Sequence, residues 1–600
     1  VTEMMLQEDI ASTPFEEPEE IVPDFKATVQ EDFGNDSNMN TLSSSAMQAA
    51  LRGEEPFKEV ERRLETELIP IELPTYDQVA QPNRADLTSV VETRGTTEHA
   101  GGVEGAMDQI AFEIANACRR NKTLVVWLFD ASNSQKDRRE AIAQRFKNIY
   151  EQVGLQGVGE GDLLLTAAVS FGDKTTFLID EPTSTIEPLA DKIMQIPNDE
   201  TGRENVFTAL EDVSRKWGKY RMREKREVMY IIVTDERGDD FGKEGEKMER
   251  VIHEIAKAGV RVHCIGNAAI FGREKGYVNV TWTEGENTFT QDLPVDQGPE
   301  TFYPENLELD FWGLSSRKRQ LNNLSSSFGP YPLNRLCAET GGLYLVAGEG
   351  DRTVKYDFEL MRPYLPDYRP IPDLNREIGS SKAKTALVTA SQKFRIDRIN
   401  MPLLTFDGSS DQILRNEILE AQKGEIVILD YRLDEVLRIL QEGEKDRDQL
   451  TEPRWRAAFD LAIGRVLAMK VRAYGYNTML GQMRINIKPF TKPNSNFWVL
   501  VPSTDMADAI PSVRKMAKQA EEYLRRVIDE HPGTPWATIA EAEFAQAMGW
   551  TWVEEYVPKD GNMAMGNGNN DLPQLLLAED QRRREEMRNP RPRPQNPPKQ

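Results

Sequence analysis

Between Gly102 and Gly348, short apolar runs alternate with segments that carry helical periodicity. Thr123–Phe129, Val228–Thr234 and Val260–Ile265 have the length and the β-branched content of buried strands. Segments such as Asp137–Gln152 between them repeat apolar residues at the spacing of one helix face. Strands that alternate with helices predict an α/β doubly wound domain, in which helices cover both faces of a mostly parallel sheet.

The same rhythm predicts the other elements of this domain, over residues 102–350. Further strands are expected at Leu163–Phe171, Thr175–Ile179 and Leu343–Val346, and helices at Ala111–Arg119, Val206–Trp217, Met248–Ala258 and Leu333–Glu339. Phe271–Tyr331 breaks the pattern with Gly, Pro, Asn and aromatic residues, although Tyr277–Thr283 is strand-like. Because compact domains rarely contain such long loops, we expect residues 271–331 to be an insertion.

A change of period after the α/β region predicts a second, mainly α-helical domain over residues 394–557. Apolar stripes at helical spacing run through Asp411–Gln422, Leu433–Gln441, Trp455–Met479 and Ser512–Glu530, with one strand candidate at Phe497–Val501. The Pro-containing residues 351–393 are expected to be a linker between the two domains. Residues 512–552 resemble a tetratricopeptide-type helical hairpin with a turn at His531–Ala537.

The net charge of −25 is distributed unevenly along the 600 residues. Val1–Asp36 holds eleven acidic side chains against Lys26, so we expect residues 1–100 to be an acidic, largely extended arm. Residues 558–600 are expected to be a flexible Gly/Asn segment followed by a basic, Pro-rich tail. The acidic balance disfavours nucleic acid as a partner, because phosphates would be repelled.

Oxygen-bearing side chains follow two of the predicted strands. Asp130, Ser132 and Ser134 occupy every second position of the loop after the first strand. Asp235 directly follows the strand Val228–Thr234. The carboxyl ends of parallel strands meet at one edge of a sheet, where ligands bind. Carboxylates and hydroxyls are hard ligands, so the pattern predicts Mg²⁺, or else Mn²⁺ or Ca²⁺. The structural alternative is that Asp130 and the serines cap the following helix.

Leu124–Ser134 resembles the start of a von Willebrand factor type A domain, whose metal-ion-dependent adhesion site has the pattern D-x-S-x-S. Thr234-Asp235 is similar to the later T-D motif of that family, and Leu336–Gly342 is similar to its closing helix and T-G-G turn. The resemblance covers about Gly102–Ala347 without the insertion. It implies a doubly wound sheet, a cation at the carboxyl edge, and a carboxylate of a partner protein that completes the coordination.

The chain departs from the family pattern at three positions. Asn133 and Glu236 stand where the family usually has glycine, and Asn tolerates a positive φ better than most residues. Glu204 stands where a metal-binding threonine is expected, and Thr208 follows one helical turn later. Glu204 and Thr208 are therefore further candidate ligands. Glu204 could bind the cation directly, or pair with Arg203 and leave a degenerate site.

Nothing in the sequence supplies an enzyme active site. The turn after the first strand lacks the glycines of a dinucleotide-binding loop, and there is no G-x-x-x-x-G-K-[ST] motif. Ser132 lacks the G-x-S-x-G context of a serine hydrolase, and we expect His253 and His263 to be structural. The three cysteines and four histidines are too scattered for a zinc cluster, and the cysteines are expected to be buried free thiols.

Aromatic residues in the insertion are candidates for partner binding, because the insertion leaves the sheet at the edge that carries the predicted cation. These candidates are Tyr277, Trp282, Phe311 and Trp312. The alternative is that the insertion packs its own aromatic side chains.

We therefore predict non-catalytic, cation-dependent protein binding within a larger assembly, with no small-molecule substrate. The alternative is a structural scaffold with a degenerate metal site that binds through the insertion and the helical domain. The chain begins at Val1, so we expect a processed or partial chain, and a membrane tether only through a segment upstream of Val1. A cell-envelope or membrane-tethered location is expected over a cytoplasmic one.

Overall fold

The computed structural model describes residues 97–99, 101–153, 163–284, 287–312, 321–348, 353–395, 402–506, 509–557 and 572–588. The predictions made for residues 1–96 and for the Gly/Asn segment 558–571 lie outside these ranges, as does the basic tail from residue 589 onward.

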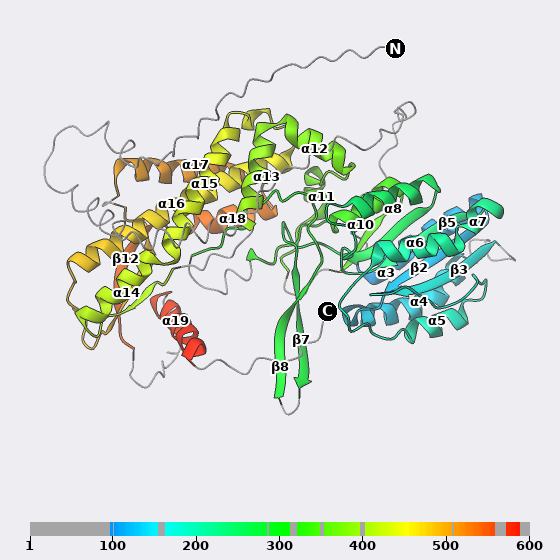
Figure 1. Cartoon of the computed structure of the whole chain (residues 1–600), viewed down its shortest axis with the longest axis horizontal. Helices are drawn as coiled ribbons and strands as arrows, with labels where there is room; N and C mark the ends of the chain where they lie inside the picture. The colour runs from blue at the N-terminus through cyan, green and yellow to red at the C-terminus, as the bar shows by residue number, and fades with distance from the viewer. Residues whose placement is uncertain are drawn as a thin grey trace, which may run out of the picture. The chain divides into compact units, whose positions relative to one another are not determined.

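A seven-stranded, mostly parallel sheet forms the centre of the α/β part (Figure 1), in the order β1-β9-β6-β5-β2-β3-β4. Only β4 is antiparallel to its neighbour. The strands are β1 (Thr97–His99), β2 (Thr123–Asp130), β3 (Leu164–Phe171), β4 (Thr176–Phe177), β5 (Glu227–Val233), β6 (Arg261–Asn267) and β9 (Tyr344–Gly348). The α/β fold class predicted from the alternating pattern is confirmed.

Helices cover both faces of this sheet because successive residues of the buried strands point to opposite sides. Leu124, Val126 and Leu128 of β2 pack with the apolar faces of one helix group, and Val125, Trp127 and Phe129 pack with those of the other. The first group is α6 (Val206–Trp217), α8 (Glu246–Lys257) and α10 (Tyr331–Thr340). The second is α3 (Val103–Arg120), α4 (Lys136–Val153) and α5 (Glu187–Met194). A short helix, α7 (Lys219–Arg223), precedes β5.

The predicted insertion consists of two parts with different roles. Strands β7 (Gly276–Glu284) and β8 (Asn287–Val295) form an antiparallel ribbon that projects from the α/β part (Figure 1). Of the following residues, Phe302 packs against the core of the α/β part, whereas Leu307, Leu309 and Trp312 belong to the core of the helical part. The predicted strand Tyr277–Thr283 is confirmed as β7.

The second part of the chain is mainly helical, as its periodicity predicts. Its helices are α11 (Phe358–Met361), α12 (Ile371–Ser380), α13 (Lys382–Arg395), α14 (Asp411–Lys423), α15 (Glu425–Glu444), α16 (Pro453–Ile485), α17 (Pro511–Glu530), α18 (Pro535–Phe544) and α19 (Leu572–Arg588), with 3₁₀ turns at Arg362–Tyr364 and Arg447–Gln449. A three-stranded antiparallel sheet contains β10 (Thr405–Asp407), β11 (Phe497–Ser503) and β12 (Gly549–Glu555).

Four boundaries differ from the prediction. The arm predicted over residues 1–100 contains strand β1, which pairs in parallel with β9. The predicted linker contains α11, α12 and most of α13, whose residue Leu387 is fully buried in the helical core. The predicted hairpin 512–552 is α17 and α18, but its last residues belong to strand β12. The predicted tail contains α19, whose residue Leu577 packs on β11.

Buried ion pairs attach residues 299–312 to the helical part. Arg454, at the start of α16, lies 2.7 Å from Glu300 and also pairs with Glu305, and all three side chains are buried. Arg465 of α16 binds Glu543 of α18 at 3.1 Å and donates to the carbonyl oxygen of Leu309 at 2.6 Å. Burial of a charge is tolerated only when it is paired, so these contacts fix the position of the segment.

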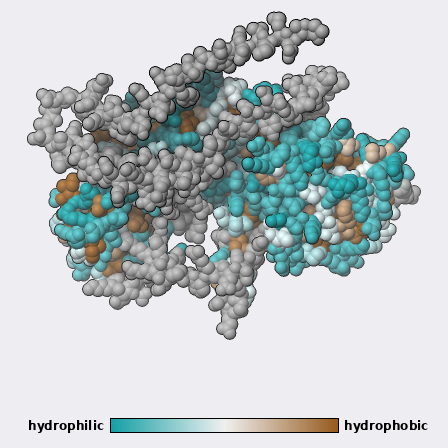
Figure 2. Space-filling view, in the orientation of Figure 1, coloured by the Kyte–Doolittle hydropathy of each residue, from teal (hydrophilic) through white to brown (hydrophobic). Residues whose placement is uncertain are grey.

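The visible face of the α/β part is predominantly hydrophilic, with small scattered apolar patches (Figure 2). Phe112 and Met222 are exposed apolar side chains of this part, and isolated residues of this kind are ordinary for a folded domain. Cys118, Cys264 and Cys337 are buried free thiols, as predicted. Among the described helices, none combines the length and the apolarity that crossing a membrane requires.

Replacing Arg454 by methionine should destabilise the protein by about 3–5 kcal/mol, because Glu300 and Glu305 would remain buried without their counter-ion. Urea denaturation followed by tryptophan fluorescence measures the free energy of unfolding. The control is Arg376→Met, which removes an exposed pair with Asp373 and should change that energy by less than about 0.5 kcal/mol. Equal effects of the two substitutions would refute a special role for the buried pairs.

Candidate metal centre

Parallel pairing of β2 with β5 brings the predicted acidic residues together. Phe129 is in register with Val233, so Asp130 and Thr234 follow at the same edge of the sheet. The Thr234 hydroxyl donates to Asp130 Oδ2 at 2.7 Å, and both side chains are fully buried. Asp235 comes next in the chain and is also buried. The two carboxylates therefore meet at the carboxyl edge of the sheet, as the sequence predicts.

The two serines of the loop lie between these carboxylates. Ser132 Oγ is 3.1 Å from Ser134 Oγ, and Ser134 donates to Asp235 Oδ1 at 3.3 Å. Asp130 Oδ1 accepts the backbone N–H of Ser132 at 2.7 Å, which forms a tight Asx turn. The Ser132 side chain does not cap the 3₁₀ turn that follows, so the helix-capping alternative does not account for its hydroxyl. The structure thus brings all four predicted ligands into one group.

A buried arginine donates hydrogen bonds to the backbone of this loop. Arg139 of α4 donates one guanidinium N–H to the carbonyl oxygen of Asp130 and one to that of Ser132, the latter at 2.8 Å. Nη2 of Arg139 donates to Asn198 Oδ1 at 2.9 Å, and Asn198 Nδ2 donates to Asn133 Oδ1 at 3.0 Å. Asn133 is not among the described non-glycine residues with positive φ. The loop therefore does not require the glycine that the type A family usually has there.

Glu204 lies beside this group, together with two acidic residues, Glu236 and Asp239, that the sequence analysis did not propose as ligands. One carboxylate oxygen from each of Glu204, Glu236 and Asp239 lies within 4.8 Å of the others. The Asp239 N–H donates to the Glu204 carbonyl oxygen at 2.8 Å, and the Glu204 N–H donates to Asp239 Oδ2 at 3.3 Å. Glu204 is 2% exposed, yet its Oε2 is buried without a hydrogen-bond partner. The only sequence signal for Glu236 was its departure from the family glycine.

Burial and mutual repulsion favour the protonated form of these acids. Loss of solvation, reinforced by the charge of Asp235, raises the pKa of Asp130 to about 6. Loss of solvation also raises the pKa of Asp235, although Arg138 opposes that shift. Burial raises the pKa of both Glu204 and Glu236. The contact with Glu236 raises the pKa of Glu204 further, whereas the hydrogen bond with Glu204 partly offsets the rise at Glu236, so the pair retains a proton at neutral pH. Nearby positive charge is therefore insufficient to compensate the cluster.

Thr208 is engaged elsewhere. Its hydroxyl donates to Asp240 Oδ2 at 2.6 Å, and Lys247 Nζ lies 2.6 Å from the same carboxylate oxygen and 2.5 Å from the Thr208 hydroxyl. The N–H groups of Phe207 and Thr208 also donate to Asp240. This network caps the start of α6 and occupies the hydroxyl, which corrects the prediction of Thr208 as a ligand.

The aromatic candidates separate into two groups. Phe311 and Trp312 are 7% and 4% exposed and belong to the helical core, where Trp312 contacts Tyr476 and Trp550. Their prediction as partner-binding residues is therefore wrong, because a large apolar ring is more stable in a core than at a wet surface. Tyr277 of β7 is 51% exposed, and Trp282 is partly buried against Phe289.

The ribbon β7–β8 is connected to the acidic cluster at its base. The N–H of Asp296, one residue after β8, donates to Glu236 Oε1 at 3.2 Å. The side chains of Arg237 and Asp296 pair at 3.1 Å, and the Arg237 N–H donates to the Asp296 carbonyl oxygen at 3.2 Å. A change in the charge of Glu236 would consequently alter its hydrogen bond with Asp296 at the base of the ribbon.

The chemistry of this group fits a divalent cation. Buried carboxylates and hydroxyls offer hard oxygen atoms, and the unpartnered Oε2 of Glu204 is an acceptor without a donor. A cation would supply the missing positive charge and release the shared proton. Asp130, Ser132, Ser134 and Asp235 would hold it, with Glu204 as a further carboxylate.

The structure defines a doubly wound α/β domain with a group of buried carboxylates and hydroxyls at the carboxyl edge of its sheet. The chain matches no protein-family model, and no curated protein matches its sequence. Among solved structures it is similar to proximal thread matrix protein 1 from the mussel byssus. One crystal form is 17% identical, with a TM-score of 0.18 over 24% of this chain. A structure described as having a zinc-occupied MIDAS motif is 19% identical, with a TM-score of 0.20 over 25% of this chain.

Each of these matches covers 36% of the mussel chain, so this chain matches about a third of that protein. Because the TM-scores are low, we base the fold class on the observed sheet and its strand order.

In the presence of a chelator, the melting temperature should fall as the pH rises from about 5 to about 8. Asp130, Glu204 and Glu236 have raised pKa values in the folded protein, so the folded state binds more protons than the unfolded state in this window. Stability is then greatest at low pH and is lost as the pH rises through the folded-state values.

Thermal melting with a chelator at several pH values tests this expectation, and Glu204→Gln is the matched variant. Removal of one acid should raise the melting temperature at pH 8 and flatten the pH dependence. The same slope in both proteins would contradict the assignment of the effect to this cluster.

Proposed function

We propose that this protein is a non-catalytic binding protein whose α/β domain holds a divalent cation and engages a partner protein at the same edge. The observation that supports this most strongly is the buried cluster of acids without sufficient counter-charge around Asp130, Asp235 and Glu204. Such a cluster costs stability in the absence of a cation, so its presence is explained when a cation binds there.

The donor set favours Mg²⁺, or else Mn²⁺ or Ca²⁺. All proposed ligands are carboxylate or hydroxyl oxygens, and the acidic group near Glu204 contains glutamate and aspartate. Zinc sites in proteins are built mainly from cysteine and histidine. The donor set of this chain therefore favours one of these three ions over zinc.

Glu204 changes how a partner would bind at this edge. In the type A resemblance, a carboxylate of the partner completes the coordination of the cation. Glu204 stands at the ligand position of the family threonine and adds a negative charge to the site, which weakens the attraction for a further carboxylate. Partner contact would then depend more on the neighbouring ribbon, where Tyr277 is half exposed and the base contacts Glu236.

A structural scaffold with a degenerate metal site is the second candidate. The proton shared by Glu204 and Glu236 favours it, because a carboxyl pair can be stable without a metal when it holds a proton. Binding would then occur through the ribbon and through the helical hairpin formed by α17 and α18. The two candidates differ in whether a cation stabilises the folded protein.

Titration with Mg²⁺, Mn²⁺ or Ca²⁺ should raise the melting temperature by about 5–10 °C at a concentration about one hundred times the dissociation constant. Asp130→Ala should abolish this shift, since Asp130 is the buried centre of the proposed ligand group. Asp180→Ala, which removes a fully exposed carboxylate, is the matched control and should retain the shift. A wild-type protein that none of the three ions stabilises would exclude the cation-dependent function and leave the scaffold.

A further inference from the structure

A cavity lies at the amino edge of the central sheet, opposite to the acidic cluster. It has a volume of about 320 Å³ and is formed where β5 and β6 begin and where α3, α8 and α10 end. Strands β2, β5 and β6 are parallel, so their amino ends share this edge and their carboxyl ends share the other. The cavity is therefore independent of the proposed cation site.

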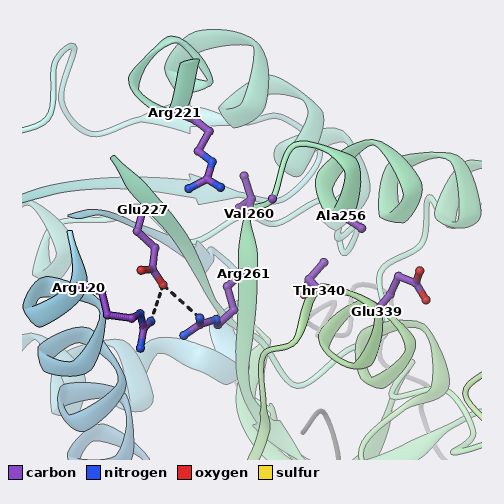
Figure 3. Close-up of a pocket in the computed structure, with 9 residues that line it drawn as sticks. Arg120, Arg221, Glu227, Ala256, Val260, Arg261, Glu339 and Thr340 are labelled. Carbon is purple, nitrogen blue, oxygen red and sulfur yellow. Dashed lines mark hydrogen bonds and ion pairs between the residues drawn. The ribbon is translucent and has the colours of Figure 1, made fainter. Parts of the chain in front are cut away.

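Three arginines from different elements surround this cavity (Figure 3). Arg120 comes from the end of α3, Arg221 from α7 and Arg261 from the start of β6. The acidic lining residues are Glu227 and Glu339, so the lining carries three positive and two negative charges. This balance contrasts with the net charge of −25 for the whole chain.

Glu227 is shared between two of the arginines. Its carboxylate lies 2.7 Å from Arg120 and 3.1 Å from Arg261, as the dashed lines in Figure 3 show. Arg261 also lies 3.5 Å from Glu113 outside the cavity. The second acid, Glu339, pairs with the buried Arg335 at 2.7 Å. The acids of the lining are therefore already engaged by arginines.

Arg221 has no acidic partner among the residues that the structure describes. One of its nitrogens donates to the carbonyl oxygen of Arg226 at 3.3 Å. Its guanidinium lies over the turn at Gly259, where an added Cβ atom would be 2.8 Å from Nη2. Gly259 has φ +68°, so this turn both needs glycine for its backbone and leaves room for the guanidinium. Figure 3 shows the Arg221 side chain directed toward Glu227 and Val260.

We infer that this cavity binds a phosphate group. The planar guanidinium presents paired N–H donors that match the oxygens of phosphate, and Arg221 offers a charge that no described acid neutralises. The lining is mostly charged, with Val260 and Ala256 as its apolar members, which suits a compact anion better than an aromatic ligand. The group would come from free phosphate or from a phosphorylated side chain of a protein.

Inorganic phosphate, added to the full chain at constant ionic strength with a chelator present, is the probe. Calorimetric titration should show saturable binding to the wild type. Arg221→Gln should weaken the affinity about tenfold, which is the effect of losing one charge-assisted hydrogen bond. Arg223→Gln, from the same short helix but outside the cavity lining, is the matched control and should bind as the wild type does.

Glu227→Gln should change the affinity in the opposite direction. It removes the carboxylate that occupies Arg120 and Arg261, so phosphate should bind more tightly than to the wild type. Opposite effects of Arg221→Gln and Glu227→Gln would support the cavity, because general destabilisation would weaken binding in both. Absence of saturable binding, or equal affinity in the wild type and Arg221→Gln, would overturn the inference.

A phosphoserine peptide with uncharged flanking residues identifies the source of the group. Binding of the peptide that is lost in Arg221→Gln would indicate a phosphorylated protein, and binding of inorganic phosphate alone would indicate the free ion. The chelator keeps this test separate from the proposed cation site, which would be empty throughout the measurement.

Discussion

The pairing of β2 with both of its neighbours is the constraint on which the site depends. All eight residues of β2 are buried, and the strand is in parallel register with β3 on one side and β5 on the other. A shift of the register by one residue would turn every side chain of β2 to the wrong face. The apolar core therefore fixes where β2 ends relative to β5, and this places Asp130 beside Thr234 and Asp235. The precision of the acidic cluster comes from the packing of residues that have no part in its chemistry.

The cluster itself opposes folding, which is why it carries functional information. A buried carboxylate is stable only when it is paired, hydrogen-bonded or protonated. The helical part shows the paired solution, in which Glu543 contacts both Arg465 and Arg472 and keeps a lowered pKa, although burial alone would raise it. Glu204 and Glu236 instead have raised pKa values, and Glu204 Oε2 is buried without a hydrogen-bond partner. The same chain thus neutralises one buried acid with arginines and leaves another group of acids in need of positive charge.

Periodicity predicted most strands and helices of the α/β part, including the short strand β4, but it missed β1 and the helices of the predicted linker and tail. The bounds of α6, Val206–Trp217, agree with the predicted helix because its apolar face repeats without interruption. Strand β1 has only three residues and is stabilised by its partner β9, so its own sequence carries little signal. The four primary ligand candidates were predicted because they share a motif. Glu236 and Asp239 were missed because their approach to Glu204 depends on the path of the loop after β5.

The fates of the aromatic residues show why exposure is harder to predict than secondary structure. Tyr277 and Trp312 belong to the same predicted insertion and have similar apolar character. Trp312 is buried because its segment packs against α16. Arg465 of α16 donates hydrogen bonds to the carbonyl oxygens of Leu307 and Leu309 in that segment. Tyr277 lies on a two-stranded ribbon and remains half exposed. The distinction is made by partners more than one hundred residues away in the chain, so no local pattern contains it. What remains exposed near the acidic cluster is therefore a property of the tertiary fold and not of any local sequence pattern.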